Sequence, residues 1–302
     1  MVDQLAQEYA GQPVVFLEYD VDAGFSSRYS LWWAAFRGSQ AILPLVMVDS
    51  GNQISYGHVE YNSVYKAMVD ASLIRAAQAE MQAFAWRDGN KVDFYVQLQN
   101  LTDITLSPSN WARVHGIIYE DIRAGVTDRY VRATVSASIT NLTPNASAQF
   151  RFETADLNGV NWDNLHYIVL ADYKPPESPG AFDMLQAVRA ISLPAPFYIQ
   201  PNPHTFLIDP AKPTTPSAIL NIKGVNFLSW SATENISWLA ISPTNGDMNT
   251  KPIITVDTAI LSPGMQQGVI TFTTTDSYFS EEVTVGAYYG PIEYLYLPSV
   301  NR

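Results

Sequence analysis

The sequence predicts a multidomain protein, in which an α/β unit is followed by two all-β sandwiches. Three observations favour this fold class. The chain has 302 residues, too many for one ordinary domain. After residue 88, apolar and polar residues alternate over many short segments, as is typical of half-buried strands. A proline-rich stretch, 174–203, separates the two all-β regions.

Residues 1–84 show helix and strand patterns in alternation. The turn Asp49-Ser50-Gly51-Asn52 between two apolar runs indicates a hairpin. The elements expected around it follow from apolar periodicity. In order, they are a helix ending near Gly11, a strand over 14–19, a helix over 26–38, the hairpin strands 45–48 and 53–57, and a long helix over 61–84.

This order, with Pro44 placed just before an apolar strand, resembles the C-terminal half of a thioredoxin fold. The resemblance puts Pro44 where thioredoxins carry a cis-proline, and residues 1–11 at the tail of the helix that carries the redox Cys-x-x-Cys. It implies a partial thioredoxin-like domain over 1–84 that begins just after the catalytic motif and lacks the central strand. The cis form of an X-Pro bond costs only about 0.5–1 kcal/mol, so we expect a cis Pro44.

Residues 88–173 predict an antiparallel, immunoglobulin-like β-sandwich, because strand patterns recur there between turn residues. The expected strands are Lys91–Leu101, Arg113–Tyr119, Tyr130–Ile139, Ala148–Phe152 and Leu165–Leu170. The proline-rich stretch that follows, 174–203, predicts a semi-rigid linker. It brackets one short helix expected over Gly180–Ile191, with Ser178 as its cap and Pro179 at its first position.

The region 204–290 holds two tryptophans and two characteristic turns in a fixed order. Trp230 ends one strand pattern, Trp238 lies in a Ser-Trp-Leu strand, and a Ser-Pro-x-x-Gly turn, a Leu-x-Pro-Gly turn and a Gly-x-Ile-Thr-Phe-Thr strand follow. This pattern resembles the BACON family of bacterial immunoglobulin-like modules. The resemblance implies an extracellular spacer or binding domain without chemistry, and we expect both tryptophans to be core residues. The apolar tail, 291–302, is expected to add an edge strand.

Charge and composition limit the partners and the compartment. Acidic residues outnumber basic ones by 29 to 17, and the formal net charge is -12. Nucleic acids and anionic membranes attract clustered Lys and Arg, so we expect neither partner. Charged residues make up 15% of the chain, against roughly 25% in an average soluble domain. A surface rich in Ser, Thr, Asn and Gln is typical of secreted β proteins and favours an extracellular or cell-envelope location.

The sequence shows no targeting, membrane or thiol chemistry. Met1-Val2-Asp3-Gln4 opens directly into a polar helical pattern, so no signal peptide is visible. No run approaches the roughly 18 apolar residues of a transmembrane helix. The chain has no cysteine, which excludes disulfides, thiolate metal sites and thiol redox chemistry within these residues.

Residues for catalysis or metal binding are sparse. His115 and His166 lie in expected strands of one domain and could meet, whereas His58 and His204 lie elsewhere; we expect all four to be ordinary histidines. Asp20, Asp22 and Asp49 flank strand ends, where Asp is a common terminator. Asp156–Asp163 is a β-turn connection or a calcium loop, although it lacks EF-hand spacing.

Other motifs of catalysis are absent from the sequence. Glu281 and Glu282 are neighbours on an expected strand, so they point to opposite faces and cannot form a glycosidase pair. No nucleophile elbow, phosphate loop or dinucleotide fingerprint appears. We therefore predict no catalytic, cofactor-binding or metal-ligating residue.

Exposed aromatic rings are the remaining candidates, because flat rings stack on sugar faces. The candidates in loops and at edges are Trp162, Tyr278, Phe279, Tyr288 and Tyr289. The predicted function is non-catalytic binding or adhesion at the cell surface, with carbohydrate or a cell-envelope protein as the partner. Two alternatives stay open: an exported thiol-disulfide oxidoreductase whose cysteines precede this chain, and a structural spacer. The oligomeric state is not predicted.

Overall fold

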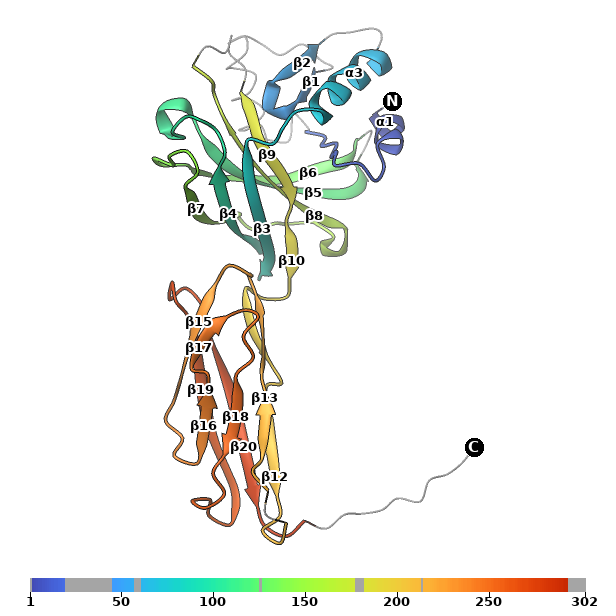
Figure 1. Ribbon diagram of the computed structural model, residues 1–302. Helices are drawn as coiled ribbons and strands as arrows, with labels where there is room; N and C mark the ends of the chain where they lie inside the picture. Colours follow the sequence, from blue (N-terminus) through green and yellow to red (C-terminus); the bar gives the residue numbers. More distant parts are fainter. Residues whose placement is uncertain are drawn as a thin grey trace, which may run out of the picture. The chain divides into compact units, whose positions relative to one another are not determined.

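The chain is mostly β and forms two compact units, residues 1–194 and 195–302 (Figure 1). The computed structural model describes residues 2–19, 45–56, 61–124, 127–176, 182–212 and 214–292. Within these ranges, no helix has both the length and the apolar character needed to cross a membrane.

Unit 1 contains a sandwich of two four-stranded sheets, with the orders β10-β3-β4-β7 and β6-β5-β8-β9. Neighbouring strands are antiparallel, except that β10 runs parallel to β3. The strands are β3 Ala79–Asp88, β4 Lys91–Asn100, β5 Arg113–Ala124, β6 Thr127–Ser138, β7 Ser147–Glu153, β8 Leu165–Tyr173, β9 Asp183–Arg189 and β10 Ile191–Leu193.

The core of this sandwich forms from alternate residues of the facing strands. Phe94 and Leu98 of β4 and Val114 and Ile118 of β5 are fully buried and belong to one cluster. Between the last two lies Gly116, where an added Cβ would come within 2.9 Å of the Phe94 ring. Because interiors are close-packed, only glycine lets the ring of Phe94 lie against β5.

A layer of N-terminal residues covers the other face of the β6-β5-β8-β9 sheet. We call residues 2–19, 45–56 and 61–76 the N-terminal layer. Its elements are α1 Val2–Glu8, β1 Leu45–Val48, the 3-10 turn Asp49–Gly51, β2 Gln53–Tyr56 and α3 Tyr61–Leu73. Figure 1 shows the two helices and the β1–β2 hairpin gathered on one side of unit 1.

The N-terminal layer is joined to the sandwich by apolar packing. We call the covered side chains of the sheet, Ile117, Tyr119, Ile168 and Leu170, the outer face. Val15, Leu17, Tyr19 and Met47 pack against the outer face. A second cluster lies within the layer and joins α1, α3 and the hairpin; it contains Leu5, Tyr9, Tyr65, Met68 and Val69.

Hydrogen bonds and ion pairs also hold the layer in place. The Glu18 amide donates to the Arg129 carbonyl at 3.0 Å, and the Val131 amide donates to the Glu18 carbonyl at 3.0 Å. Arg75 bridges two carboxylates, with Asp49 at 2.8 Å and with Asp183 of β9. Both apolar and polar contacts therefore join the N-terminal layer to the sandwich of unit 1.

The expected thioredoxin-like unit is not supported. The segment expected to be a strand over 14–19 makes a parallel bridge from Glu18 to Tyr130 of β6, while β1 pairs with β2 alone. Val15, Leu17 and Tyr19 pack against the outer face of the sandwich. They are therefore covered without the central strand of a thioredoxin fold. Pro44, the expected helix 26–38, Asp20 and Asp22 lie outside the described residues.

Two expected helices are wrong in part or entirely. α3 ends at Leu73, residues 74–78 form a turn, and the last residues of the expected helix 61–84 belong to strand β3, so the expected boundary between 84 and 88 falls inside a strand. The described part of the expected helix Gly180–Ile191 forms β9 and the first residue of β10, so the expected linker supplies two strands of the sandwich. Ser178 and Pro179 lie outside the described residues. Pairing with β4 and β8 overrides the local helix propensity of both segments.

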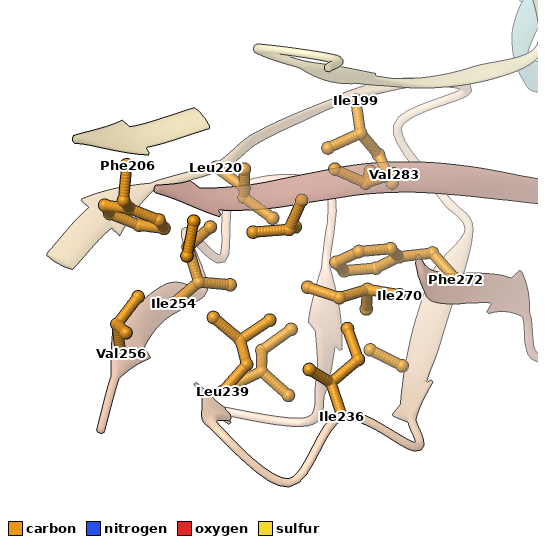
Figure 2. Close-up of a cluster of buried hydrophobic side chains, with 14 of the residues drawn as sticks. Ile199, Phe206, Leu220, Ile236, Leu239, Ile254, Val256, Ile270, Phe272 and Val283 are labelled. Carbon is orange, nitrogen blue, oxygen red and sulfur yellow. The ribbon is translucent and has the colours of Figure 1, made fainter. Parts of the chain in front are cut away.

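Unit 2 is a second sandwich, built from a five-stranded sheet β12-β20-β19-β15-β17, a three-stranded sheet β13-β18-β16 and the pair β11-β14. The strands are β11 Phe197–Gln200, β12 His204–Ile208, β13 Ser217–Ile219, β14 Asn221–Gly224, β15 Ser229–Glu234, β16 Leu239–Ser242, β17 Asn245–Asp247, β18 Ile253–Val256, β19 Gly264–Thr274 and β20 Ser280–Tyr289. In Figure 2, Leu239 and Ile254 point toward Ile270 and Phe272 across the core.

Both tryptophans singled out in the sequence belong to this core. Trp230 is 0% exposed and Trp238 is 7% exposed. Trp238 lies in the turn just before β16, so strand alternation does not fix its direction, and it is buried together with Leu239 and Ile241. Most of the apolar tail, 293–302, lies outside the described residues.

Candidate ligand pocket beside Trp162

A cavity of about 330 Å³ lies where the chain leaves the end of β9 and crosses to β10 in the other sheet. The short 3-10 helix η3, Trp162–Asn164, leads into β8 on the other side of this cavity. The lining residues combine one indole, charged groups and hydroxyl groups; they are Trp162, Asp163, Leu165, His166, Tyr167, Arg189, Ala190 and Ser192.

A buried carboxylate positions η3. The Asn161 amide donates to Glu120 Oε1 at 2.7 Å, and Asn161 Oδ1 accepts from the Asp163 amide at 3.2 Å. Glu120 is only 1% exposed, and its other oxygen pairs with Arg132 Nε. Because a buried carboxylate is costly unless its oxygens are satisfied, this arrangement fixes the turn that carries Trp162.

One face of the Trp162 indole is already occupied. The Arg87 guanidinium carbon lies 4.0 Å from the ring centroid, and Arg87 Nε donates to the Gly89 carbonyl at 2.8 Å. Cation–π contacts of this kind hold a ring in a fixed orientation. Trp162 is half-buried and also packs against the core of the first sandwich, so a ligand in the cavity reaches only the part of the ring that stays exposed.

Tyr167 and His166 both line the cavity, but as neighbours on β8 they direct their side chains to opposite faces of the sheet. The Tyr167 ring packs edge-on to Phe94, with centroids 6.2 Å apart. Burial raises the pKa of the Tyr167 hydroxyl, opposed in part by the charge of Arg87, so the hydroxyl stays neutral at physiological pH. His166 stacks on Tyr119 with centroids 4.9 Å apart, and its Nε2 lies 3.9 Å from Asp121 Oδ2.

The remaining polar groups can donate and accept hydrogen bonds in many directions. Asp163 is exposed and carries acceptor oxygens, Ser192 carries a hydroxyl, and Arg189 carries five N–H donors. The arrangement is suited to hold a polar molecule against an aromatic wall.

The other aromatic candidates belong to unit 2, whereas Trp162 belongs to unit 1. Tyr278 and Phe279 precede β20, whereas Tyr288 and Tyr289 end it. A strand rises about 3.3 Å per residue, so the two pairs lie roughly 30 Å apart. Tyr278 is 63% exposed, while Phe279 and Tyr289 pack against the core of unit 2.

The two histidines expected in one domain do not meet. His115 of β5 is paired with Leu170 of β8, whereas His166 is paired with Tyr119. His115 is buried and its Nε2 lies 3.4 Å from Asp172 Oδ1. His204 packs edge-on to Phe206, with centroids 4.5 Å apart. His58 lies outside the described residues.

Among the residues that the structure describes, no group of three or more His, Asp and Glu side chains is placed to hold a metal ion. Asp49 is engaged with Arg75 and with the Ser72 hydroxyl. Glu281 and Glu282 are neighbours on β20. A larger cavity of about 500 Å³ lies between β2 and α3, and the described residues that line it, Gln53, Ile54, Ser55, Tyr56, Val64 and Met68, carry no charged group to orient a ligand.

Sequence reasoning named Trp162 as a candidate, expected His166 to be an ordinary histidine, and did not name Arg87, Arg189 or Ser192. Arg189 and Ser192 lie in the stretch that was expected to be helix and linker. Arg87 is brought to Trp162 across 75 residues of sequence, and no local pattern signals that contact.

No protein family model and no curated protein matches the chain. Among solved structures, a domain of the outer membrane lipoprotein Omp28 from Porphyromonas gingivalis matches at 14% identity and a TM-score of 0.25, covering 39% of this chain and 91% of that chain. The sialic acid binding region of the Streptococcus sanguinis SK1 adhesin matches at 9% identity and a TM-score of 0.27, covering 70% and 78%. TM-scores of this size do not indicate a common fold.

Proposed function

We propose that this chain is a non-catalytic carbohydrate-binding protein of the cell surface or envelope, and that the pocket beside Trp162 holds the sugar. The observation that supports this proposal is the indole of Trp162, fixed by Arg87 in the wall of a cavity of about 330 Å³. Ligand pockets typically combine such apolar surface with a few well-placed polar groups.

The chemistry of a sugar matches this lining. A pyranose has an apolar C–H face, which packs on an aromatic ring, and hydroxyl groups around its rim. Asp163 accepts hydrogen bonds from such hydroxyls, and Arg189 and Ser192 donate to their oxygens. The low content of charged residues supports an extracellular or envelope location.

Unit 2 has a different proposed role. Its core is formed entirely by its own residues, between Phe197 and Tyr289, and both cavities described above are lined by unit 1. We propose that unit 2, in keeping with its resemblance to BACON modules, is a spacer that displays unit 1.

A glycan array probed with the full chain tests the proposal. Trp162→Ala should abolish binding to the glycans that the wild-type chain retains, because it removes the aromatic wall. Tyr278→Ala removes an exposed ring from unit 2 and is the matched control that should leave binding unchanged. Loss of binding in Tyr278→Ala alone would move the site to unit 2, and no glycan bound by the wild-type chain would contradict carbohydrate binding altogether.

A further inference from the structure

Arg189 differs from the other arginines whose side chains the structure describes. Four of these arginines pair with carboxylates: Arg75, Arg129, Arg132 and Arg151. Arg87 covers Trp162, and Arg113 donates to the Ser136 hydroxyl at 3.1 Å. Arg189 is exposed at the end of β9 and lines the pocket, and no described carboxylate pairs with it.

A guanidinium that borders a pocket and that no described carboxylate neutralises favours an anionic group on the ligand. Arginine binds carboxylates through two parallel N–H···O bonds, which gives both affinity and a fixed orientation. The chain has a formal net charge of -12. The positive charge of Arg189 is therefore opposite in sign to the net charge of the protein.

The acids around the pocket limit how much negative charge the ligand carries. Asp163 lines the same cavity, and Asp121 lies 3.9 Å from His166. A ligand with many sulfates or phosphates would be repelled by these carboxylates. A ligand with one carboxylate for Arg189, and with hydroxyls for Asp163 and Ser192, meets no such repulsion.

We propose that Arg189 binds the carboxylate of an acidic sugar, such as a uronic or sialic acid residue, whose ring lies against Trp162. This inference rests on the proposed carbohydrate binding of the pocket. A volume of about 330 Å³ suits one or two sugar units of a longer glycan. Arg189 thereby determines the specificity of the site for acidic over neutral sugars.

Calorimetric titration of the full chain with two pairs of probes tests this inference. The pairs are methyl glucuronide with its methyl ester, and a methyl sialoside with its methyl ester; each ester replaces the carboxylate with an uncharged group that is one methyl larger. The wild-type chain should bind one acid about 10-fold or more tighter than its ester, since hydrogen bonds between charged groups are the strong ones. Arg189→Gln should remove that preference, and Arg189→Lys should keep part of it.

Control variants separate the possible failures. Arg113→Gln removes one positive charge elsewhere on unit 1 and should keep the preference for the acid. If acid and ester bind equally and Trp162→Ala abolishes both, carbohydrate binding stands and the role of Arg189 is overturned. A preference that survives in Arg189→Gln also overturns that role. If no acidic or neutral sugar binds the wild-type chain, the proposed function itself fails, and the inference with it.

Discussion

The indole Nε1 of Trp230 donates a hydrogen bond to the backbone carbonyl oxygen of Asp247, at 2.7 Å. The same ring lies against Phe272, with centroids 5.4 Å apart. One fully buried side chain of β15 therefore satisfies a polar group of the edge strand β17 and fills the core between the sheets of unit 2.

Substitutions at Trp230 should separate these two roles. Trp230→Ala is expected to lower the free energy of unfolding of unit 2 by about 3–5 kcal/mol, because a large buried ring is lost. Trp230→Phe keeps much of the ring but removes the hydrogen bond to the carbonyl of the exposed Asp247, which contributes about 0.5–1.5 kcal/mol. Amide hydrogen exchange of residues 195–292 measures both. Trp111→Ala removes a 51% exposed ring from unit 1 and is the control. Equal stability of Trp230→Ala and the wild type would contradict the packing role.

Stability near Asp247 should depend on pH. The Thr250 hydroxyl, followed by the backbone amides of Asn249 and Thr250, donates to the Asp247 carboxylate and lowers its pKa. Since the folded pKa lies below the unfolded one, this contribution is present above about pH 4 and is lost as pH falls through the lowered folded pKa. Asp247→Asn should therefore be less stable than the wild type at pH 7, and the difference should shrink toward pH 2. Urea unfolding across this range measures the difference; a gap that does not change with pH would argue against the effect.

Gly268 permits the close approach of Ile236. An added Cβ at Gly268 would lie 2.3 Å from Ile236 Cδ1, a distance that forces a shift. Gly268→Ala should destabilise unit 2 by about 1–3 kcal/mol, as overpacking commonly does. Adding Ile236→Ala makes room for the new methyl group, so the double variant should be more stable than the sum of the two single effects predicts. Strict additivity in thermal unfolding would show that the two side chains do not compete for space.

The N-terminal layer should open more readily than unit 2. Its hydrogen exchange over 2–19 and 45–73 is expected to be faster than that of 205–290, because a short hairpin and two helices contribute few strand pairs. Arg75→Met breaks the ion pairs to Asp49 and Asp183, and should speed exchange in the layer further while β3 to β8 stay protected. Equal or stronger protection of the layer than of unit 2 would contradict this prediction.

The strands of unit 1 were predictable where alternation and turn residues agree. The expected strands Lys91–Leu101 and Leu165–Leu170 correspond to β4 and β8 within a few residues. β3 and β9 were not predictable, because Ala, Met, Gln and Leu favour helix locally and only pairing with distant strands makes these segments extended. Local patterns carry no information about such pairing.

The candidate site was predictable only in part, for the same reason. Trp162 follows a Gly- and Asn-containing stretch, which indicates a loop and exposure. Arg189 and Ser192 reach the pocket only because β9 and β10 cross from one sheet to the other. A stretch assigned to helix and linker cannot place them beside Trp162.

The covered outer face determines where the chain can be divided into fragments for expression. A fragment that starts at Ala79 would keep every strand of the first sandwich but would present Ile117, Tyr119, Ile168 and Leu170 to water. Apolar surfaces of this kind promote aggregation, so such a fragment should be insoluble. A division after Pro194 leaves each apolar cluster whole. Residues 1–194, the N-terminal layer and the sandwich together, therefore form one folding unit that should be expressed whole.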